Sequence, residues 1–305
     1  MKALVFPGQG AQYLGMGKSF YEEFPEAKQI FSIAEGVVGI DLAKVCFQGP
    51  QEELKKTSTQ QLAILIVALA GLEVLKKRKN ILKEVSYLSG LSLGEYTCLY
   101  PAEVLTLEEL IYLVKERALA MEEASLENPS SMLAVIGMKE EDLRKKEREL
   151  GFYIANINSP HQVVISLSRE GKERVKKELE NLGARVVELA VSGGFHSPFM
   201  EPAKRRLEKV MESLKFKDAK IPIVSNFTAT SHCDSSDLKR NLLNQLVSPV
   251  MWKRCVEFMV EKGVTTFVEI GPSKILRGLI RKISPQSRVI NFENAKDYFD
   301  LEKEG

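Results

Sequence analysis

Cysteine and histidine are scarce in this 305-residue chain, which contains four cysteines and three histidines. The cysteines show no C-x-x-C pair and no metal-ligand spacing, so we expect reduced thiols, no disulfide and no metal site. That pattern is typical of a cytoplasmic protein. Chemistry that needs an imidazole can come only from His161, His196 or His232.

An excess of charge is also absent, since 43 Lys and Arg residues oppose 41 Asp and Glu residues for a formal net charge of +2. This balance argues against a nucleic-acid-binding protein that works by bulk charge. The N-terminus reaches Pro7 too soon for a signal peptide. The long apolar run 62–75 contains Glu73 and is too short to span a bilayer, so it predicts a buried helix and no membrane segment.

The most informative motif is Gly90-Leu91-Ser92-Leu93-Gly94. It lies between an apolar, strand-like run that begins at Val85 and a short helix-like segment that ends at Pro101. A serine on such a strand-to-helix turn is a nucleophile elbow: flanking glycines permit the tight turn, and the helix directs free N–H groups at a developing oxyanion. The alternative is an ordinary strand end bracketed by glycines.

The order of elements indicates an α/β protein with two parts. The first 128 residues alternate short apolar runs with helical periodicity, as in a parallel sheet covered by helices. From residue 129 to 191 the order βαββαβ predicts a ferredoxin-like small subdomain inserted into a discontinuous large subdomain, 1–128 plus 192–305. We expect the active site between the two parts, and we expect the charged tail 294–305 to fray. The predicted elements of the insert are strand 132–138, helix 140–150, strand 153–157, strand 162–166, helix 171–182 and strand 186–191.

Arg117 lies on the apolar stripe of a helix that a capping box, Thr106 with Glu109, is expected to start. The arginine therefore points into the protein, where a guanidinium needs an anion. Two interpretations remain open at this point. The partner is either an internal carboxylate, with Glu95 as one candidate, or the carboxylate of a substrate.

A serine needs an adjacent base, and histidine is the usual one. His232 lies in a polar stretch typical of a surface turn, and His161 follows a proline at the start of a predicted strand. His196 lies next to glycines at the end of the small subdomain, within Phe195-His196-Ser197-Pro198. It is a candidate base for Ser92, and the alternative is a histidine that serves only the packing of the core or a turn.

Six blocks in this order resemble the malonyl-CoA:acyl-carrier-protein transacylases, and the likeness extends to about residue 285. The resemblance implies an α/β-hydrolase-like large subdomain with a short parallel sheet, and malonyl transfer through a seryl ester. The blocks are Phe6 to Gln12, Gly90 to Tyr96, Arg117, Phe195 to Pro198, Asn244 to Val250, and Glu269 to Pro272.

The resemblance also implies a role for individual residues. Ser92 and His196 would form a catalytic dyad whose imidazole is oriented by the main-chain carbonyl of Gln245, and Arg117 would bind the malonyl carboxylate. The backbone N–H groups of Gln9 and Leu93 would form the oxyanion hole. An aromatic residue before the histidine fits malonyl better than methylmalonyl. The further pocket residues would be Gln61, Asn158, Met121 and Phe195.

The second substrate implied is an acidic carrier protein, and this chain has no Asp-Ser-Leu attachment site, so the carrier must be a separate chain. Two basic clusters could dock it: Lys274, Arg277, Arg281 and Lys282, or Lys204-Arg205-Arg206. We expect a cytoplasmic monomer that needs no metal or redox cofactor. An esterase or thioesterase on the same elbow, or a non-catalytic carrier-docking subunit, remains the alternative.

Overall fold

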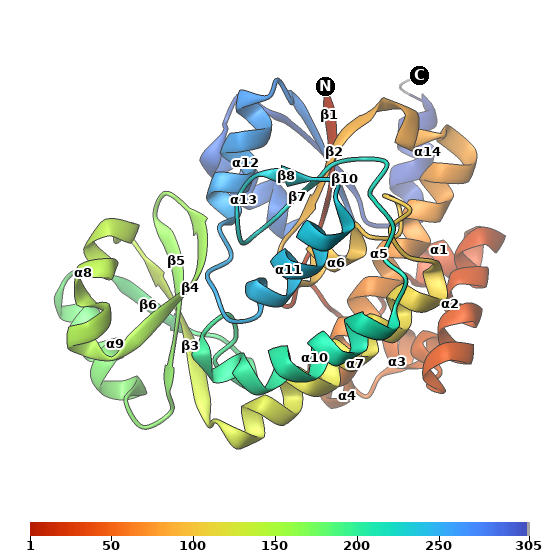
Figure 1. The fold of residues 1–305 in the computed structure, drawn as a ribbon. Coiled ribbons are helices and arrows are strands. Elements are labelled where there is room, and N and C mark those ends of the chain that lie inside the picture. Colours follow the sequence, from red (N-terminus) through yellow and green to blue (C-terminus); the bar gives the residue numbers. More distant parts are fainter. Residues whose placement is uncertain (304–305) are drawn as a thin grey trace.

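The computed structural model describes residues 1–303 and contains two sheets with helices packed around them (Figure 1). The larger sheet has the strand order β10-β9-β1-β2-β7-β8. Neighbouring strands from β10 to β7 are parallel, whereas β8 is antiparallel to β7. The strands of this sheet are β1 (Lys2–Phe6), β2 (Val85–Gly90), β7 (Ile223–Val224), β8 (Ser231–His232), β9 (Thr266–Ile270) and β10 (Arg288–Phe292).

Strand β1 lies inside this sheet and is covered on both faces. Its residues alternate between two apolar cores: Leu4 and Phe6 pack into the core that contains α5 (Thr57–Lys79), and Val5 packs into the core that contains α12 (Trp252–Glu261) and α13 (Ile275–Ile283). Figure 1 shows these two helix layers on opposite sides of the sheet. A strand buried on both faces reads as a continuous apolar run, which is why its sequence predicts a parallel α/β layer.

Helix α5 is longer than the apolar run that predicts it, because it continues for 23 residues to Lys79. By length and hydropathy it is long enough to cross a membrane, so the argument that the segment is too short was wrong. Within the part of the chain that the structure describes it is the one such helix, and 94% of its most apolar window is buried inside the protein. This burial agrees with the core helix that the sequence predicts.

The smaller sheet has the strand order β4-β5-β3-β6, with every neighbouring pair antiparallel. With one helix after the first strand and one after the third, this is the ferredoxin-like βαββαβ arrangement, so the predicted fold class is confirmed. The unit lies at one end of the molecule in Figure 1. Its elements are β3 (Ser130–Ile136), α8 (Glu140–Leu150), β4 (Phe152–Ser159), β5 (Gln162–Ser168), α9 (Lys172–Asn181) and β6 (Arg185–Glu188).

The C-terminal segment does not fray as expected, since it forms helix α14 (Ala295–Lys303); residues 304–305 lie outside the described residues. Asp297 Oδ2 accepts the backbone N–H groups of Glu293 and Asn294 at 2.8 and 2.9 Å, which fixes the start of the helix. The ring of Tyr298 lies 5.3 Å from that of Phe24. These contacts hold the tail on the body of the protein.

The remaining helices connect these elements and surround the larger sheet. They are α1 (Lys18–Glu23), α2 (Pro25–Val38), α3 (Leu42–Gln48), α4 (Gln51–Lys55), α6 (Leu93–Thr97), α7 (Leu107–Glu127), α10 (Glu201–Ser213) and α11 (Ser235–Gln245), with short 3-10 turns at Ile81–Glu84 and Pro198–Met200.

Candidate active site

Ser92 lies on the turn between β2 and α6, as the motif predicts. Its backbone has φ 52° and ψ −98°, a conformation that a residue with a side chain adopts rarely. The flanking glycines are required by close approach of the backbone: a Cβ on Gly90 would lie 2.1 Å from the carbonyl carbon of Gly94, and a Cβ on Gly94 would lie 2.0 Å from the carbonyl oxygen of Phe6. The turn is therefore held tightly against β1.

Asn226, which the sequence reading missed, fixes this turn from the side. Its Oδ1 accepts the backbone N–H of Ser92 at 2.8 Å, and its Nδ2 donates to the carbonyl of Gly90 at 2.8 Å. Asn226 follows β7, which pairs with β2 in parallel, so the ends of both strands meet at one edge of the sheet. The two-residue strand was too short to be recognised, and without it the position of Asn226 could not be inferred.

His196 lies next to Ser92, with 2.8 Å between Nε2 and Oγ. Its Nδ1 lies 2.7 Å from the backbone carbonyl of Gln245. Because a carbonyl only accepts, Nδ1 carries the proton and Nε2 is left as the acceptor for the serine hydroxyl. This is the tautomer that a general base needs.

The small subdomain anchors the segment that carries His196. The Ser130 hydroxyl accepts the N–H of Gly194 at 2.7 Å, and the Ser166 hydroxyl donates to the carbonyl of Phe195 at 2.6 Å. The large subdomain thus supplies the serine, and the small subdomain positions the chain on which the histidine lies.

Burial, with a smaller contribution from the nearby positive charge of Arg117, lowers the pKa of His196 to about 4, against the opposing effect of the Gln245 hydrogen bond. The imidazole is therefore neutral near pH 7 and able to accept a proton. The other two histidines lie elsewhere. His161 is exposed after β4, and the His232 ring contacts Thr228, Thr230 and Asp237.

Arg117 is fully buried on α7, and the predicted capping box of Thr106 and Glu109 starts this helix. Its Nη2 donates to Ser92 Oγ at 3.0 Å, and its Nη1 donates to Gln61 Oε1. The guanidinium also lies over the ring of Tyr96, with 4.6 Å from Cζ to the ring centroid. Burial lowers the pKa of this arginine from its usual range.

Within residues 1–303 the Arg117 guanidinium forms no ion pair, and its Nε has no hydrogen-bond partner. Glu95, the candidate partner, instead accepts the backbone N–H of Asn226 at 2.9 Å and the side-chain amide of Gln245 at 2.6 Å. The internal ion pair is therefore not formed. Elsewhere in this protein Arg78 binds the carboxylate of Glu26 through its Nε and Nη2. In Arg117 the Nε is free to donate to a carboxylate, whereas Nη2 already donates to Ser92 Oγ and lies 3.4 Å from Gln245 Oε1.

A cavity of about 110 Å³ opens beside Ser92 and His196 between the two subdomains. Gln9 lines it from the loop after β1, Phe195 lines it next to the histidine, and Asn158 lines it from β4. The buried Oδ1 of Asn158 has no hydrogen-bond partner in the part of the chain that is described. The complete lining is Gly8, Gln9, Leu91, Ser92, Met132, Asn156, Asn158, Val164, Leu189, Val191, Phe195 and His196.

The remaining predicted pocket residues lie around this cavity. Gln61 Nε2 donates to the sulfur of Met121 at 3.4 Å, so both residues support Arg117 from behind. Leu93 is the first residue of α6 and is fully buried. Among the described residues the backbone N–H groups of Gln9 and Leu93 have no hydrogen-bond acceptor. Both N–H groups are therefore free to donate to an oxyanion, as the predicted oxyanion hole requires.

The two basic clusters differ in how many of their cationic side chains lack an ion-pair partner. In the 204–206 cluster, Lys204 donates to Asn244, and Arg206 binds both Glu116 and Glu123. On α13, which packs against α12 and β4, Arg281 and Lys282 are exposed and form no ion pair with any described residue. Lys274 lies 3.8 Å from Glu293, and Arg277 is partly buried. Arg205 is also exposed and forms no ion pair with any described residue, so both clusters carry free positive charge, and α13 offers two adjacent free cations, Arg281 and Lys282.

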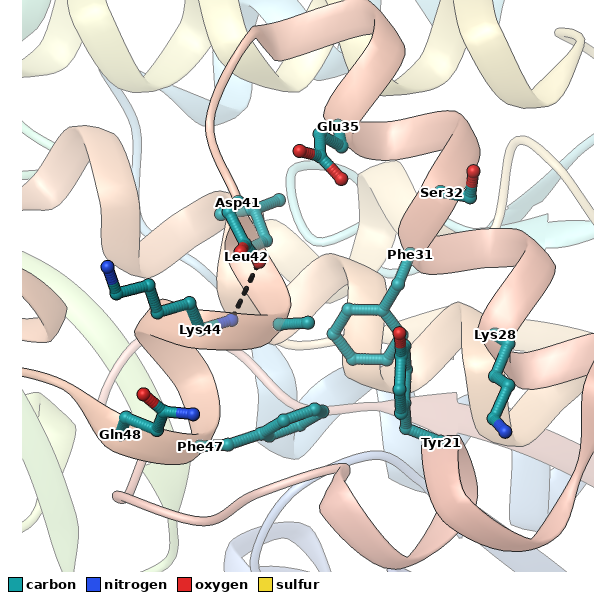
Figure 2. Close-up of a pocket in the computed structure, with 11 residues that line it drawn as sticks. Tyr21, Lys28, Phe31, Ser32, Glu35, Asp41, Leu42, Lys44, Phe47 and Gln48 are labelled. Atoms are coloured by element: carbon teal, nitrogen blue, oxygen red, sulfur yellow. Dashed lines mark hydrogen bonds between the residues drawn. The ribbon is translucent and has the colours of Figure 1, made fainter.

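A second cavity of about 410 Å³ lies among α1, α2 and α3 and shares no residue with the first. Figure 2 shows the rings of Tyr21, Phe31 and Phe47 gathered in it. Their centroids are 5.3–5.5 Å apart, in edge-on or tilted contact. The carboxylate of Asp41, at the rim, accepts the N–H of Lys44 at 2.8 Å and so caps α3.

A serine hydrogen-bonded to a neutral histidine on a nucleophile elbow, with a buried arginine beside it, is the arrangement of an acyl-transfer site. Comparison with known proteins agrees, since the family described as "Acyl transferase domain" matches residues 3–293.

The similar proteins narrow this class. The chain is 38% identical over 294 residues to the malonyl CoA-acyl carrier protein transacylase of Bacillus subtilis, covering 94% of this chain and 92% of that protein. The crystal structure of the transacylase of that name from Clostridium perfringens has a TM-score of 0.92 at 33% identity, covering 99% of this chain and 96% of that one. A solved structure described as a type II PKS acyl-carrier protein in complex with its malonyl-transacylase matches with a TM-score of 0.94 at 34% identity. The match covers 100% of this chain and 99% of that chain. The chain belongs to the malonyl CoA-acyl carrier protein transacylase family, and the resemblance predicted from its motifs is confirmed.

Proposed function

We propose that this protein transfers the malonyl group of malonyl-CoA to the thiol of an acyl carrier protein through an ester on Ser92. The observation that carries the proposal is the guanidinium of Arg117, which is buried beside the Ser92 hydroxyl, forms no ion pair with a described residue and has an unpartnered Nε. Malonyl is an acyl group that ends in a carboxylate, and a buried guanidinium edge is suited to bind it. The names of the relatives agree with this substrate.

In the first half-reaction, His196 Nε2 takes the proton of Ser92 as Oγ attacks the thioester carbonyl. The backbone N–H groups of Gln9 and Leu93 stabilise the oxyanion, and losing one such donor typically costs about 3 kcal/mol of transition-state stabilisation. When the intermediate collapses, the C–S bond breaks and the imidazolium returns the proton to the CoA sulfur. In the second half-reaction the carrier thiol gives its proton to His196 and attacks the ester, and Ser92 regains its proton as it leaves.

The surrounding residues set the substrate. Gln61 and Met121 hold the guanidinium of Arg117 in place. Phe195 crowds the α-carbon of the acyl group, which favours malonyl over methylmalonyl, although one methyl group is worth only about 1–3 kcal/mol. The unpartnered Oδ1 of Asn158 can accept an N–H of the pantetheine arm.

We expect the carrier to dock at α13, where Arg281 and Lys282 are free to meet its acidic surface. We also expect a monomer in the cytoplasm that requires neither a metal ion nor a redox cofactor, since His196 and Arg117 supply the base and the positive charge.

The test is the intact mass of the protein after brief exposure to malonyl-CoA and to acetyl-CoA, followed by addition of holo acyl carrier protein. We expect a malonyl adduct on Ser92 that transfers to the carrier much faster than to water. Rapid loss to water without a carrier would identify an esterase or thioesterase. Binding of the carrier without any adduct would identify a non-catalytic docking subunit, and either result would overturn the proposal.

A further inference from the structure

Glu95 is a buried acid directly behind the Ser92 site. It lies in α6, three residues after the serine, and only 1% of its surface is exposed. Its Oε2 accepts two hydrogen bonds, from the backbone N–H of Asn226 at 2.9 Å and from Nε2 of Gln245 at 2.6 Å. No basic side chain in the described part of the chain forms an ion pair with it. Burying a carboxylate without a cationic partner is energetically costly, which indicates a specific role for Glu95.

Gln245 joins this acid to the reacting groups. Its backbone carbonyl holds His196 Nδ1, and its side-chain Oε1 lies 3.4 Å from Nη2 of Arg117. The Nε2 end of the same amide donates to Glu95 and, at 3.1 Å, to the backbone carbonyl of Ser92. One glutamine thus bridges a buried cation and a buried acid while its main chain orients the base.

We propose that Glu95 is the positioning residue of this site and the counter-charge of Arg117. Through Gln245 it fixes the carbonyl that orients His196, and it offsets the guanidinium charge until the carboxylate of the acyl substrate takes that place. The substrate part of this inference rests on the proposed function. It has a consequence for proton binding: once a malonyl carboxylate lies on Arg117, two acids share one cation, and protonation of Glu95 relieves the repulsion.

The surroundings leave Glu95 as the group that changes charge near neutral pH. Burial raises the pKa of Glu95 to about 7, against the lowering effects of its hydrogen bonds and of Arg117. The neighbouring thiols of Cys98 and Cys255 have raised pKa values, and so does the hydroxyl of Tyr96, so these groups stay neutral. His196 also stays neutral, because its pKa is lowered to about 4. Arg117 stays charged.

The sign of the pH effect follows from the charges. Below a pH of about 7, Glu95 takes up a proton, its negative charge disappears, and a substrate carboxylate enters the site more easily. An acetyl group has no carboxylate and is insensitive to this change. The ratio of the malonyl to the acetyl acylation rate therefore rises as the pH falls. The phosphates of CoA titrate in the same range, but they are common to both substrates and cancel in the ratio.

The experiment measures this ratio by intact mass at a series of pH values for three proteins. In the unmodified protein we expect it to rise by about three- to tenfold between roughly pH 8 and roughly pH 6. In Glu95→Gln, which keeps an acceptor oxygen for Gln245 and Asn226 but has no charge, the ratio should be high and independent of pH. Glu95→Ala should slow acylation by both substrates, because Gln245 loses its anchor, and Glu95→Gln should largely restore the acetyl rate.

Glu269→Gln is the matched control. Glu269 is also buried, with a pKa raised to about 7, but its carboxylate accepts the N–H groups of Leu276 and Arg277 at the start of α13. This variant should keep the pH dependence of the unmodified protein. A malonyl adduct whose rate ratio is flat with pH in the unmodified protein would overturn the inference alone, even if Glu95→Gln does not fold. Absence of any malonyl adduct would overturn the proposed function and the inference together.

Discussion

Two of the cavities in the described part of this protein, the one among α1 to α3 and the one beside Ser92, differ in size and in what surrounds them. The larger, of about 410 Å³, is lined by the aromatic rings of α1 to α3, and the charged side chains at its rim, such as Lys28 and Glu35, are exposed to solvent (Figure 2). The smaller, of about 110 Å³, contains a serine and a histidine that are both buried, with a buried arginine behind them. Cavity volume therefore does not locate chemistry in this fold. The site is located instead by desolvated charge and by a serine hydrogen-bonded to a histidine, because solvent screening is weakest around buried groups.

The largest expected effect tests the smaller cavity directly. Ser92→Ala should abolish the malonyl adduct, and His196→Ala should slow its formation by about three orders of magnitude or more, since nucleophile and base act as one unit. Intact mass after exposure to malonyl-CoA measures both. Ser89→Ala is the control, because the Ser89 hydroxyl only donates to the Val224 carbonyl within the sheet. A malonylated Ser92→Ala protein would show that the elbow is not the nucleophile.

The next effect concerns selectivity. In Arg117→Ala the malonyl carboxylate would enter a desolvated site without a counter-charge, a loss of roughly 2–5 kcal/mol for a buried charge pair. Acetyl-CoA should lose far less, so the ratio of malonyl to acetyl acylation rates should fall by about tenfold or more.

Arg78→Ala is the matched control for this measurement, because Arg78 binds Glu26 far from the serine. It should lower the melting temperature and leave the ratio unchanged. If Arg117→Ala lowered the melting temperature and slowed both substrates equally, Arg117 would be a structural residue.

A smaller effect is expected at the rim. Reversing Arg281 and Lys282 to Glu should raise the KM for the carrier several-fold while leaving acylation by malonyl-CoA nearly intact, because rim charges steer encounter more than they shape chemistry. The control reverses Lys215 and Lys217, which are also exposed and give the same change in net charge. Equal damage from both pairs would mean that net charge, and not a docking face on α13, attracts the carrier.

The smallest effect on activity is expected in the larger cavity. Phe47→Ala removes a half-buried ring from the contacts with Tyr21 and Phe31, and it should lower the free energy of unfolding by about 2 kcal/mol. Both acylation rates should stay within about twofold of the unmodified protein. A large loss of either rate at unchanged stability would mean that this cavity takes part in the reaction after all.

The sequence predicts the parts of the site that local patterns encode. Glycine spacing and a strand-to-helix transition identify Ser92, and helix periodicity places Arg117 on an inward stripe. The partners of these residues depend on contacts that no local pattern reveals. Asn226 reaches Ser92 from 134 positions away through a strand of two residues, and Glu95 turns to Gln245 and Asn226 rather than to Arg117.

The same limit applies to the fold. The βαββαβ order can be read along the chain, so the smaller sheet is predictable, whereas the two-residue strands β7 and β8 of the larger sheet are too short to be recognised. The C-terminal helix was missed because its charged composition suggests a free end, and the contact between Tyr298 and Phe24 that holds it is long-range. The apolar run within α5 was recognised, but the ends of the helix were not, because its first and last turns carry polar residues.

Ser92 and His196 both have positive φ angles, 52° and 57°, and each lies close to glycines in the sequence. Glycine would adopt these angles with little strain, whereas a side chain at such a position costs of the order of 1–3 kcal/mol. The proposed nucleophile and the proposed base are thus both among the six non-glycine residues with positive φ in the described part of the chain. We expect replacement of either residue by glycine to relieve part of this strain, so that the proposed roles of the hydroxyl and the imidazole are kept at a cost in stability.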